Sequence, residues 1–351
     1  MLSGLKKASI SLKEIQRYLL IKFAGDLDKV MMRIFVTALL VFSYLVGSSQ
    51  VAGAASKKCL HIRVIVPYAV GTATDLIVRA YAETINRQQS GPLLKVLNKT
   101  QKTVLEKNMK GRPDGCQILA ITQSVVSNYL DKKNKTEWSE FTPIAMLSRT
   151  PLAVVARGNL KDANLSNIME VAAQNPNVIK IGETNNPLER MFRMSLEDTS
   201  DVTFNVSVFE TARQNFLQLL SSSLDLGIIS ASAAKRRMDL KQLKVLALTD
   251  NLENSRLVGV PTLKEQGIDL SFGVDRGILA PANTPSETVE KLMERFRKAS
   301  EDQDLEGRLG KIYTKAMFLD PDSYTQYFEN LTADWSEMIV RAKKRLAQTS
   351  G

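Results

Sequence analysis

Histidine is almost absent from this sequence, and with it the side-chain sets on which many catalytic mechanisms depend. The 351 residues contain one histidine, His61, and two cysteines, Cys59 and Cys116. Zinc hydrolases need several nitrogen or sulfur ligands, and most serine hydrolases need a histidine base beside the nucleophile. We therefore expect no catalytic set, no bound metal and no cofactor.

Charge of one sign is not concentrated in any long region. Lys and Arg number 47 against 37 Asp and Glu, a net charge of +10, and the first 54 residues hold +4 of it as seven basic and three acidic residues. The remaining excess is dispersed apart from short basic clusters at Lys235–Arg237 and Lys343–Arg345. Without zinc-finger spacing or an aromatic-basic motif, we expect no nucleic-acid partner. Ordinary proportions of hydrophobic residues (44%) and charged residues (24%) predict a folded chain of about two domains.

A hydrophobic run of transmembrane length is missing, but a shorter one stands near the start. Ile34–Val46 is uncharged over 13 residues, follows basic residues, and leads to the small residues Ala52-Gly53-Ala54. This order of charged, apolar and small residues is typical of a secretory signal. It predicts residues 1–54 as a signal region cleaved after Ala54; an uncleaved membrane anchor is the alternative.

The residues around this segment refine the expectation. Residues 1–30 lengthen the charged region beyond the usual span, so we expect translation to start at Met31 or Met32. Lys58 stands before Cys59, which is not the context of a lipoprotein cysteine, so we expect a soluble mature chain in the periplasm. In that oxidising compartment Cys59 and Cys116, each at the start of a predicted strand, can form a disulfide; two buried free thiols are the alternative.

The rest of the chain alternates short apolar runs with amphipathic stretches, which indicates βαβ units around mainly parallel sheets. A first alternation predicts strands at 62–66, 93–97 and 118–121, with helices at 76–85, 104–109 and 124–130. Two apolar runs, 141–147 and 153–156, follow with no room for a helix between them. A second alternation predicts helices at 168–173, 188–196 and 216–220, strands at 178–181, 202–206, 226–229 and 245–248, and then final helices from Pro285 and Pro321.

Two such α/β lobes joined by extended segments, without a catalytic set, are typical of a solute-binding protein. We place the first lobe at 55–150, the second lobe at 151–272, and the second part of the first lobe with C-terminal helices at 273–351.

Five short motifs occur in a fixed order between residues 60 and 345. They are 62–75, which ends in Thr74-Asp75; 112–116, with a Pro-Asp-Gly turn; 141–145; 260–267, with Pro261 and Gly267; and 277–285, with Pro281 and Pro285. Together they resemble the tripartite tricarboxylate transporter solute receptors, the Bug family of bacterial periplasmic binding proteins. The resemblance implies the type II two-lobed periplasmic binding protein fold, each lobe a mostly parallel sheet flanked by helices with the ligand cleft between them.

Three stretches depart from the family pattern. Asn98–Lys102 replaces a glycine-rich loop, Phe209-Glu210-Thr211 replaces Tyr-Lys-Gly, and Gly182–Asn186 replaces a loop rich in Gly and Ser. What the resemblance implies about function is a non-enzymatic monomer that captures a small organic anion and delivers it to the membrane permease of a tripartite tricarboxylate transporter. These departures leave the identity of that anion open.

The loop after the first predicted strand is the first candidate for binding a carboxylate. Unsatisfied N–H groups at a helix start carry the positive end of the helix dipole and bind anions without Lys or Arg. Thr72 and Thr74 can add hydroxyl donors or simply cap the helix, and the resemblance favours binding. Asp75 complements the dipole or accepts a ligand hydroxyl. The candidate residues of this loop are Tyr68, Gly71, Thr72, Ala73, Thr74 and Asp75.

The opposite lobe offers a second predicted helix start at Thr184, Asn185 and Asn186, and two such helix starts would hold both ends of a dicarboxylate. Glu183 would oppose an anion, so we expect it to point outward. Arg190 and Arg193 either recognise a carboxylate or are solvated helix charges.

Further candidates follow the third predicted strand and precede a later apolar run. Thr122, Gln123 and Ser124 stand at the carboxyl edge of the sheet, where open α/β sheets place ligands, although helix capping is an equal alternative. Arg276 is either a carboxylate clamp or part of an ion pair between the lobes.

Two other functions remain open from the sequence. One is a sensor that reports its bound state to a histidine-kinase ectodomain. The other is an exported α/β enzyme, although no G-x-G-x-x-G motif follows the first predicted strand, where Gly71 stands alone.

Overall fold

The computed structural model describes residues 59–100, 105, 107, 110–133, 136–158, 164–251, 257 and 259–349. The expected signal region, both expected start positions and most of the predicted helix at 104–109 lie outside these residues.

The first lobe is built on a sheet whose strand order is β2-β1-β3-β9-β4, with β10 on the outer side of β4. β1 is parallel to its neighbours β2 and β3, while β9 is antiparallel to both β3 and β4. Val64, Ile65 and Val66 are fully buried, as expected for a strand covered on both faces. The strands are β1 (His61–Val66), β2 (Leu93–Asn98), β3 (Gln117–Thr122), β4 (Phe141–Arg157), β9 (Gly273–Pro281) and β10 (Lys315–Leu319).

Helices cover both faces of this sheet. On one face Tyr81 and Ile85 pack with Phe296, Leu305 and other residues of a single buried cluster. This face is covered by α2 (Ala73–Arg87), α9 (Ser286–Ser300) and α10 (Gln303–Gly310), and the other face by α4 (Ser124–Leu130), the short η1 (Trp138–Glu140) and α11 (Pro321–Thr349).

The second lobe contains a sheet of order β6-β5-β7-β4-β8. β5 is parallel to β6 and β7, and the end of β4 is antiparallel to β7 and β8. The helices are α5 (Leu165–Gln174), α6 (Pro187–Ser200), α7 (Ala212–Leu220), α8 (Ala231–Asp239) and the short η2 (Lys264–Gln266). The strands are β5 (Lys180–Thr184), β6 (Asn205–Phe209), β7 (Leu226–Ser230) and β8 (Leu243–Leu248).

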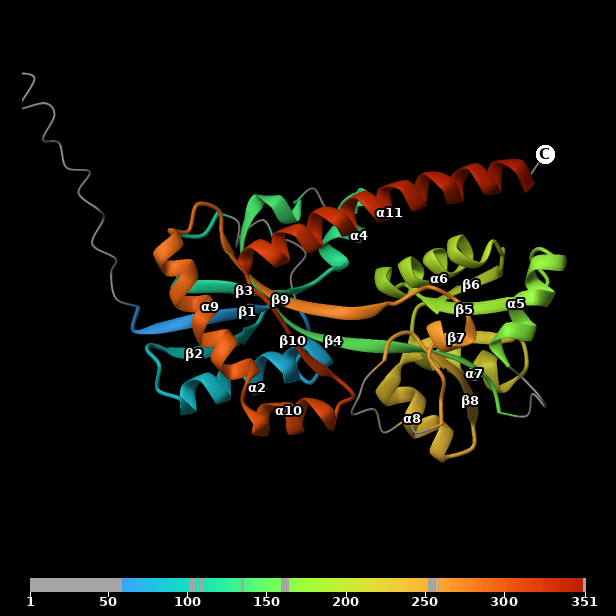
Figure 1. Ribbon diagram of the computed structural model, residues 1–351, viewed down its shortest axis with the longest axis horizontal. Helices are drawn as coiled ribbons and strands as arrows, with labels where there is room; N and C mark the ends of the chain where they lie inside the picture. The colour runs from blue at the N-terminus through green and yellow to red at the C-terminus, as the bar shows by residue number, and fades with distance from the viewer. Residues whose placement is uncertain are drawn as a thin grey trace, which may run out of the picture. The chain divides into compact units, whose positions relative to one another are not determined.

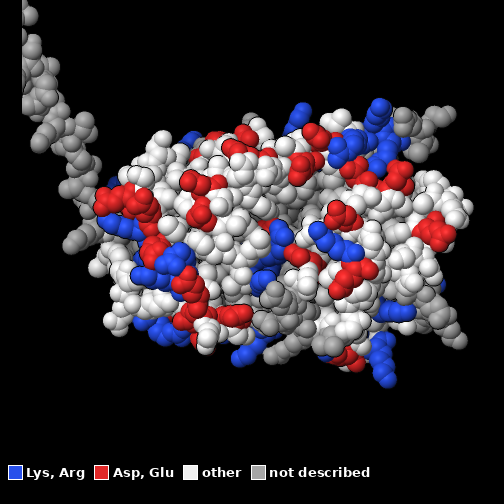
Figure 2. Space-filling view, in the orientation of Figure 1, with Lys and Arg blue, Asp and Glu red and all other residues white. Residues whose placement is uncertain are grey.

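Two structural features connect the lobes (Figure 1). β4 pairs with β9 from Phe141 to Pro151 and then with β7 and β8, so that its two halves belong to different sheets. α11 packs on α4 of the first lobe and on α6 of the second, where Arg341 and Arg345 pair with Asp198. Figure 2 shows basic side chains beside acidic ones at the C-terminal end of α11.

The structure corrects several sequence predictions. The apolar runs 141–147 and 153–156 are one 17-residue strand, because the polar stretch between them continues the pairing with β9. The predicted strand at 202–206 lies later, at β6, and α8, α10 and β10 were not predicted. α8 contains the basic cluster Lys235–Arg237, and its buried residues are the small Ala231 and Ala234, so it has few large apolar positions to mark it.

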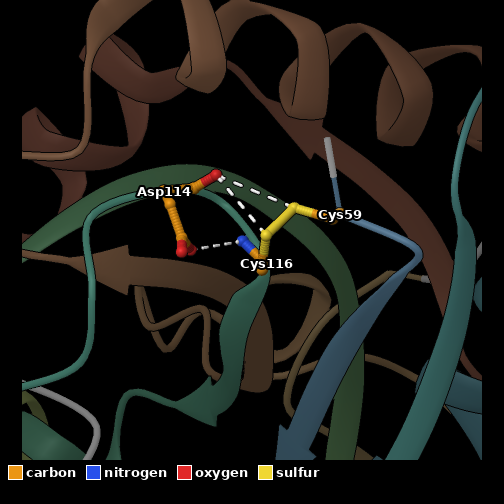
Figure 3. Close-up of a disulfide and its surroundings, with 3 residues drawn as sticks. All are labelled: Cys59, Asp114 and Cys116. Carbon is orange, nitrogen blue, oxygen red and sulfur yellow. Dashed lines mark hydrogen bonds between the residues drawn. A yellow bond between two sulfur atoms is a disulfide. The ribbon is translucent and has the colours of Figure 1, made fainter. Parts of the chain in front are cut away.

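Cys59 and Cys116 form a disulfide where β1 and β3 begin (Figure 3). Parallel pairing places the starts of both strands at one end of the sheet, and Arg63 N–H donates to the Cys116 carbonyl. Asp114 of the preceding turn accepts the Cys116 N–H through Oδ1 (2.9 Å), which fixes the approach of the chain to the bond.

Candidate functional site

The start of α2 presents open backbone donors at the carboxyl edge of the first sheet. Gly71 has φ +82°, a conformation that glycine adopts without strain, and Thr72 gives the helix no side-chain cap because its hydroxyl donates to the Ala69 carbonyl (2.8 Å). Within the described residues, the N–H groups of Ala73, Thr74 and Asp75 have no hydrogen-bond partner. An uncapped first turn of this kind attracts a negative group.

Asp75 holds the loop together from inside the protein. Its side chain, 1% exposed, accepts hydrogen bonds from Gly71 N–H (2.9 Å), Asn98 Nδ2 (2.8 Å) and Arg79 Nε (3.0 Å). Burial alone would raise the pKa of Asp75, but the hydrogen bonds from Arg79, Gly71 and Asn98 outweigh it and lower the pKa. The Gly71 N–H is thus already used within the loop. Asn98 contributes here at the position where the sequence departs from the family's glycine-rich loop.

Arg276 lies behind this loop in the middle of the first sheet. Arg276 belongs to β9, and in the strand pairing it lies opposite Thr122 of β3 on one side and Ser148 of β4 on the other. The side chain is 5% exposed; Nε donates to Thr74 Oγ1 (3.0 Å), and Nη1 donates to Thr150 Oγ1 (2.7 Å) and to the Val274 carbonyl (2.9 Å).

The guanidinium of Arg276 carries a charge that no carboxylate neutralises by direct contact. Among the described residues it forms no ion pair, and its Nη2 has no partner. Burial lowers its pKa to about 10, and the nearby Tyr68 and Asp275 oppose this only in part. Asp275 itself is paired with Arg149 (2.7 Å) and accepts from Tyr327 (2.6 Å). Of the two alternatives for Arg276, the ion pair between the lobes is not formed among the described residues, and the carboxylate clamp stays a prediction.

Three hydroxyl groups form a hydrogen-bonded set next to the guanidinium. Thr122 Oγ1 lies 2.7 Å from Ser124 Oγ and 3.0 Å from the Tyr68 hydroxyl. They come from the end of β3, the start of α4 and the loop after β1. Gln123, between them in sequence, is 3% exposed, and its side chain bonds the backbone of Gly273 (2.5 Å) and Asp275 (2.8 Å). Gln123 thus joins β3 to β9.

The corresponding loop of the second lobe uses its donors internally. Thr184 donates both its N–H (2.8 Å) and its hydroxyl (2.9 Å) to Oε2 of Glu189, and Asn186 caps α6 through the Leu188 N–H (3.0 Å). Burial raises the pKa of Glu189, and the charge of Glu183 adds to the rise. Asn185 is exposed at the tip of the loop.

Acidic and basic residues of β5 and α6, next to this loop, form a buried ion-pair cluster. Glu183 is 2% exposed and pairs with Arg193 Nε (2.8 Å), whose Nη1 pairs with Glu197 (2.5 Å). The expectation that Glu183 points outward is therefore wrong, because a basic partner on α6 satisfies it inside. Arg190 pairs with Asp131 of the first lobe.

The sequence-predicted residues thus fall into two groups. Tyr68, Thr74, Thr122, Ser124 and Arg276 meet at one edge of the first sheet, and Thr184 to Asn186 stand at the edge of the second. No hydrogen bond or ion pair within the described part of the chain joins the groups. Sequence reasoning missed Thr150, whose only signal was its place in the polar interruption between two apolar runs.

A cavity of about 880 Å³ lies elsewhere, between α6, β6 and the C-terminal part of α11. Of the candidate residues, Arg190 and Arg193 of α6 line it, and those of the loops after β1, β3 and β5 and Arg276 do not. The structure describes no cluster of acidic, histidine or cysteine side chains suited to a metal, and within its described residues no helix is long and apolar enough to cross a membrane.

The architecture defines the fold class: it is the two-lobed fold of periplasmic binding proteins. It is similar to a TctC solute-binding protein from Polaromonas (TM-score 0.69, 24% identity, covering 80% of this chain and 98% of that one). It is also similar to MatC from Rhodopseudomonas palustris, solved with malate (TM-score 0.62, 18% identity, 80% and 98% covered), and to an R. palustris protein solved with adipate (TM-score 0.65, 18% identity, 79% and 95% covered).

The profile of the tripartite tricarboxylate transporter family receptors matches residues 77–343, and the chain belongs to that family. A UPF0065 protein of Bordetella pertussis is 25% identical over 250 residues, which cover 68% of this chain and 76% of the relative. Family and fold are those of solute-binding receptors rather than of enzymes. The resemblance drawn from the five motifs is confirmed.

Proposed function

We propose that this protein is the periplasmic receptor that captures a small carboxylate and delivers it to the membrane permease of a tripartite tricarboxylate transporter. The observation that carries the proposal is Arg276, a buried guanidinium without an acidic partner, beside the open first turn of α2. A buried charge is costly unless it is paired, so this site favours an anion.

The geometry also specifies how the anion is held. The Arg276 Nη2 and the N–H groups of Ala73 and Thr74 are donors, and donors to a charged acceptor form stronger hydrogen bonds than neutral pairs do. The hydroxyls of Tyr68, Thr122 and Ser124 can donate or accept as their hydrogens rotate, which suits a ligand hydroxyl or a bridging water.

Relatives support the class of ligand. Two proteins of similar fold were solved with malate and with adipate, both carboxylates. In two-lobed binding proteins the ligand lies between the lobes and closes them about a hinge. β4 runs from one lobe to the other beside the start of β9, so we place the hinge and the lobe boundaries, near residues 150 and 272, there.

The test compares acids with their uncharged amides. We expect malate or adipate to raise the melting temperature of the mature protein, and malamide and adipamide to leave it unchanged. A ligand at 100 times its Kd stabilises by about 2.7 kcal/mol, which a thermal shift detects readily. Equal stabilisation by acid and amide would contradict an anion site.

The transport role has a separate test. Receptor loaded with radiolabelled acid is added to vesicles that contain the permease, and in parallel to an isolated histidine-kinase ectodomain. We expect uptake only with the permease and no binding to the kinase. Binding to the kinase ectodomain without uptake would assign the protein to sensing.

A further inference from the structure

The two lobes differ in charge at equivalent places. In each, the acidic residue of the first helical turn reaches back to the preceding loop: Asp75 accepts the N–H of Gly71, and Glu189 accepts the N–H of Thr184. Asp75 is compensated by Arg79, and Arg276 lies next to the same loop. Within the described residues, the first lobe therefore has one buried positive charge, that of Arg276, without an acidic partner in an ion pair.

The second lobe has the opposite balance. Within the described residues, Glu189 has no basic partner in an ion pair, and Arg193 is shared by Glu183 and Glu197. Arg190 is held by Asp131. The loop N–H that a carboxylate would use is occupied, and a further negative charge would add to that of Glu189.

Glu189 nevertheless has room for another donor. Both hydrogen bonds from Thr184 end on Oε2, and the side chain of Asn186 is a third donor that lowers the pKa of Glu189, while a carboxylate offers about four acceptor positions on its two oxygens. Glu189 stands at the carboxyl edge of β5, which is parallel to both of its neighbours, and open α/β sheets place ligands at this edge.

We propose that the ligand carries a single carboxylate, bound at Arg276 in the first lobe, and presents a hydrogen-bond donor such as a hydroxyl or an ammonium group to Glu189 in the second. This inference rests on the proposed function, and it narrows the class of ligand from carboxylates in general to hydroxy or amino acids. It also replaces the expectation that both lobes hold a carboxylate of a dicarboxylate.

The experiment measures Kd by calorimetry for length-matched sets of acids. Each set contains a diacid, the acid with a terminal hydroxyl and the acid with a terminal amine: succinate with 4-hydroxybutyrate and 4-aminobutyrate, and adipate with 6-hydroxyhexanoate and 6-aminohexanoate. We expect the hydroxyl or amino acid to bind at least about tenfold more tightly than the diacid of its set, because a second carboxylate near Glu189 is repelled.

Glu189→Gln tests which residue makes the distinction. The amide keeps an acceptor for the Thr184 N–H and removes the charge, so the diacid should gain about tenfold relative to the amino acid. Glu170→Gln, which removes an exposed acid from α5 of the same lobe, is the matched control and should leave the ratio unchanged. Circular dichroism shows whether each variant is folded.

The outcomes separate the two proposals. A wild-type protein that binds the diacid as tightly as its hydroxyl and amino counterparts overturns the inference and leaves the carboxylate receptor intact. A preference that Glu189→Gln does not reduce overturns the role of Glu189. Failure of every acid to bind overturns the proposed function, and the inference with it. Should Glu189→Gln not fold, the wild-type series alone decides.

Discussion

Replacing Arg276 by methionine should stabilise the empty protein and abolish binding of carboxylates. Methionine fills much of the same space without charge, and the arginine forms no ion pair in the described structure. A buried charged residue that binds a ligand often lowers the free energy of unfolding when no ligand is bound. The unfolding of Arg276→Met measures this loss of stability directly.

The magnitude follows from the pKa of the guanidinium. Burial lowers it from its ordinary value to about 10, and at ~1.4 kcal/mol per pH unit the charged form is destabilised by roughly 3 kcal/mol. Because the folded pKa is the lower one, this penalty is present in full at neutral pH and is relieved only as the pH rises above about 10. Replacement also removes the donor of the Thr74 hydroxyl and of the Val274 carbonyl, at about 1 kcal/mol each, whereas Thr150 keeps its hydrogen bond to Thr314. The net gain in unfolding free energy is about 1 kcal/mol.

The assay is urea unfolding at pH 7, followed by calorimetric titration with whichever acid binds the wild type. We expect a higher midpoint of unfolding and no measurable heat of binding. Arg295→Met is the matched control: Arg295 is also buried without an ion pair, in α9, and burial lowers its pKa, but it contacts Ser90 and Pro92 away from the site. The control should retain binding. A destabilised Arg276→Met protein that still binds acids would refute the reasoning.

Three further predictions concern the loop, the disulfide and the leader. Asp75→Asn should lower the free energy of unfolding by about 1–3 kcal/mol at pH 7. Because the pKa of Asp75 is lowered in the folded protein, the difference from wild type should shrink as the pH falls below 4 in unfolding experiments. A difference that stays constant with pH would contradict the charge-based account. Cys59 and Cys116 should resist alkylation in denatured, unreduced protein, and replacing both by alanine should cost about 4 kcal/mol, since their 57-residue separation closes a long loop in the unfolded chain; labelling of both thiols would disprove the bond. Sequencing of the exported protein should begin at Ala55, and a start well upstream would favour the membrane anchor.

How much of the site was visible in the sequence depends on the kind of interaction. Turn and capping signals located the loop of Gly71 and Thr72, because backbone conformation is encoded by neighbouring residues. The role of Asp75 was not predictable, because its partner Asn98 arrives from the next strand. Glu183 was misjudged for the same reason: an acid in a loop usually faces water, and only the packing of α6 against β5 supplies Arg193.

The sequence by itself determined the alternation of strands and helices, the two lobes and the family, since periodicity, turns and the order of short motifs are local properties. Tertiary structure decided that the two apolar runs around Ser148 are one strand shared by both sheets, because that follows from pairing with β9, more than a hundred residues later. It also decided which charged side chains have an ion-pair partner. Arg276 follows an acidic residue in sequence, Asp275, and Arg193 stands between Phe192 and Met194, yet folding brings two carboxylates to Arg193 and only neutral acceptors to Arg276. Long-range electrostatic pairing depends on distances in space that no local pattern records.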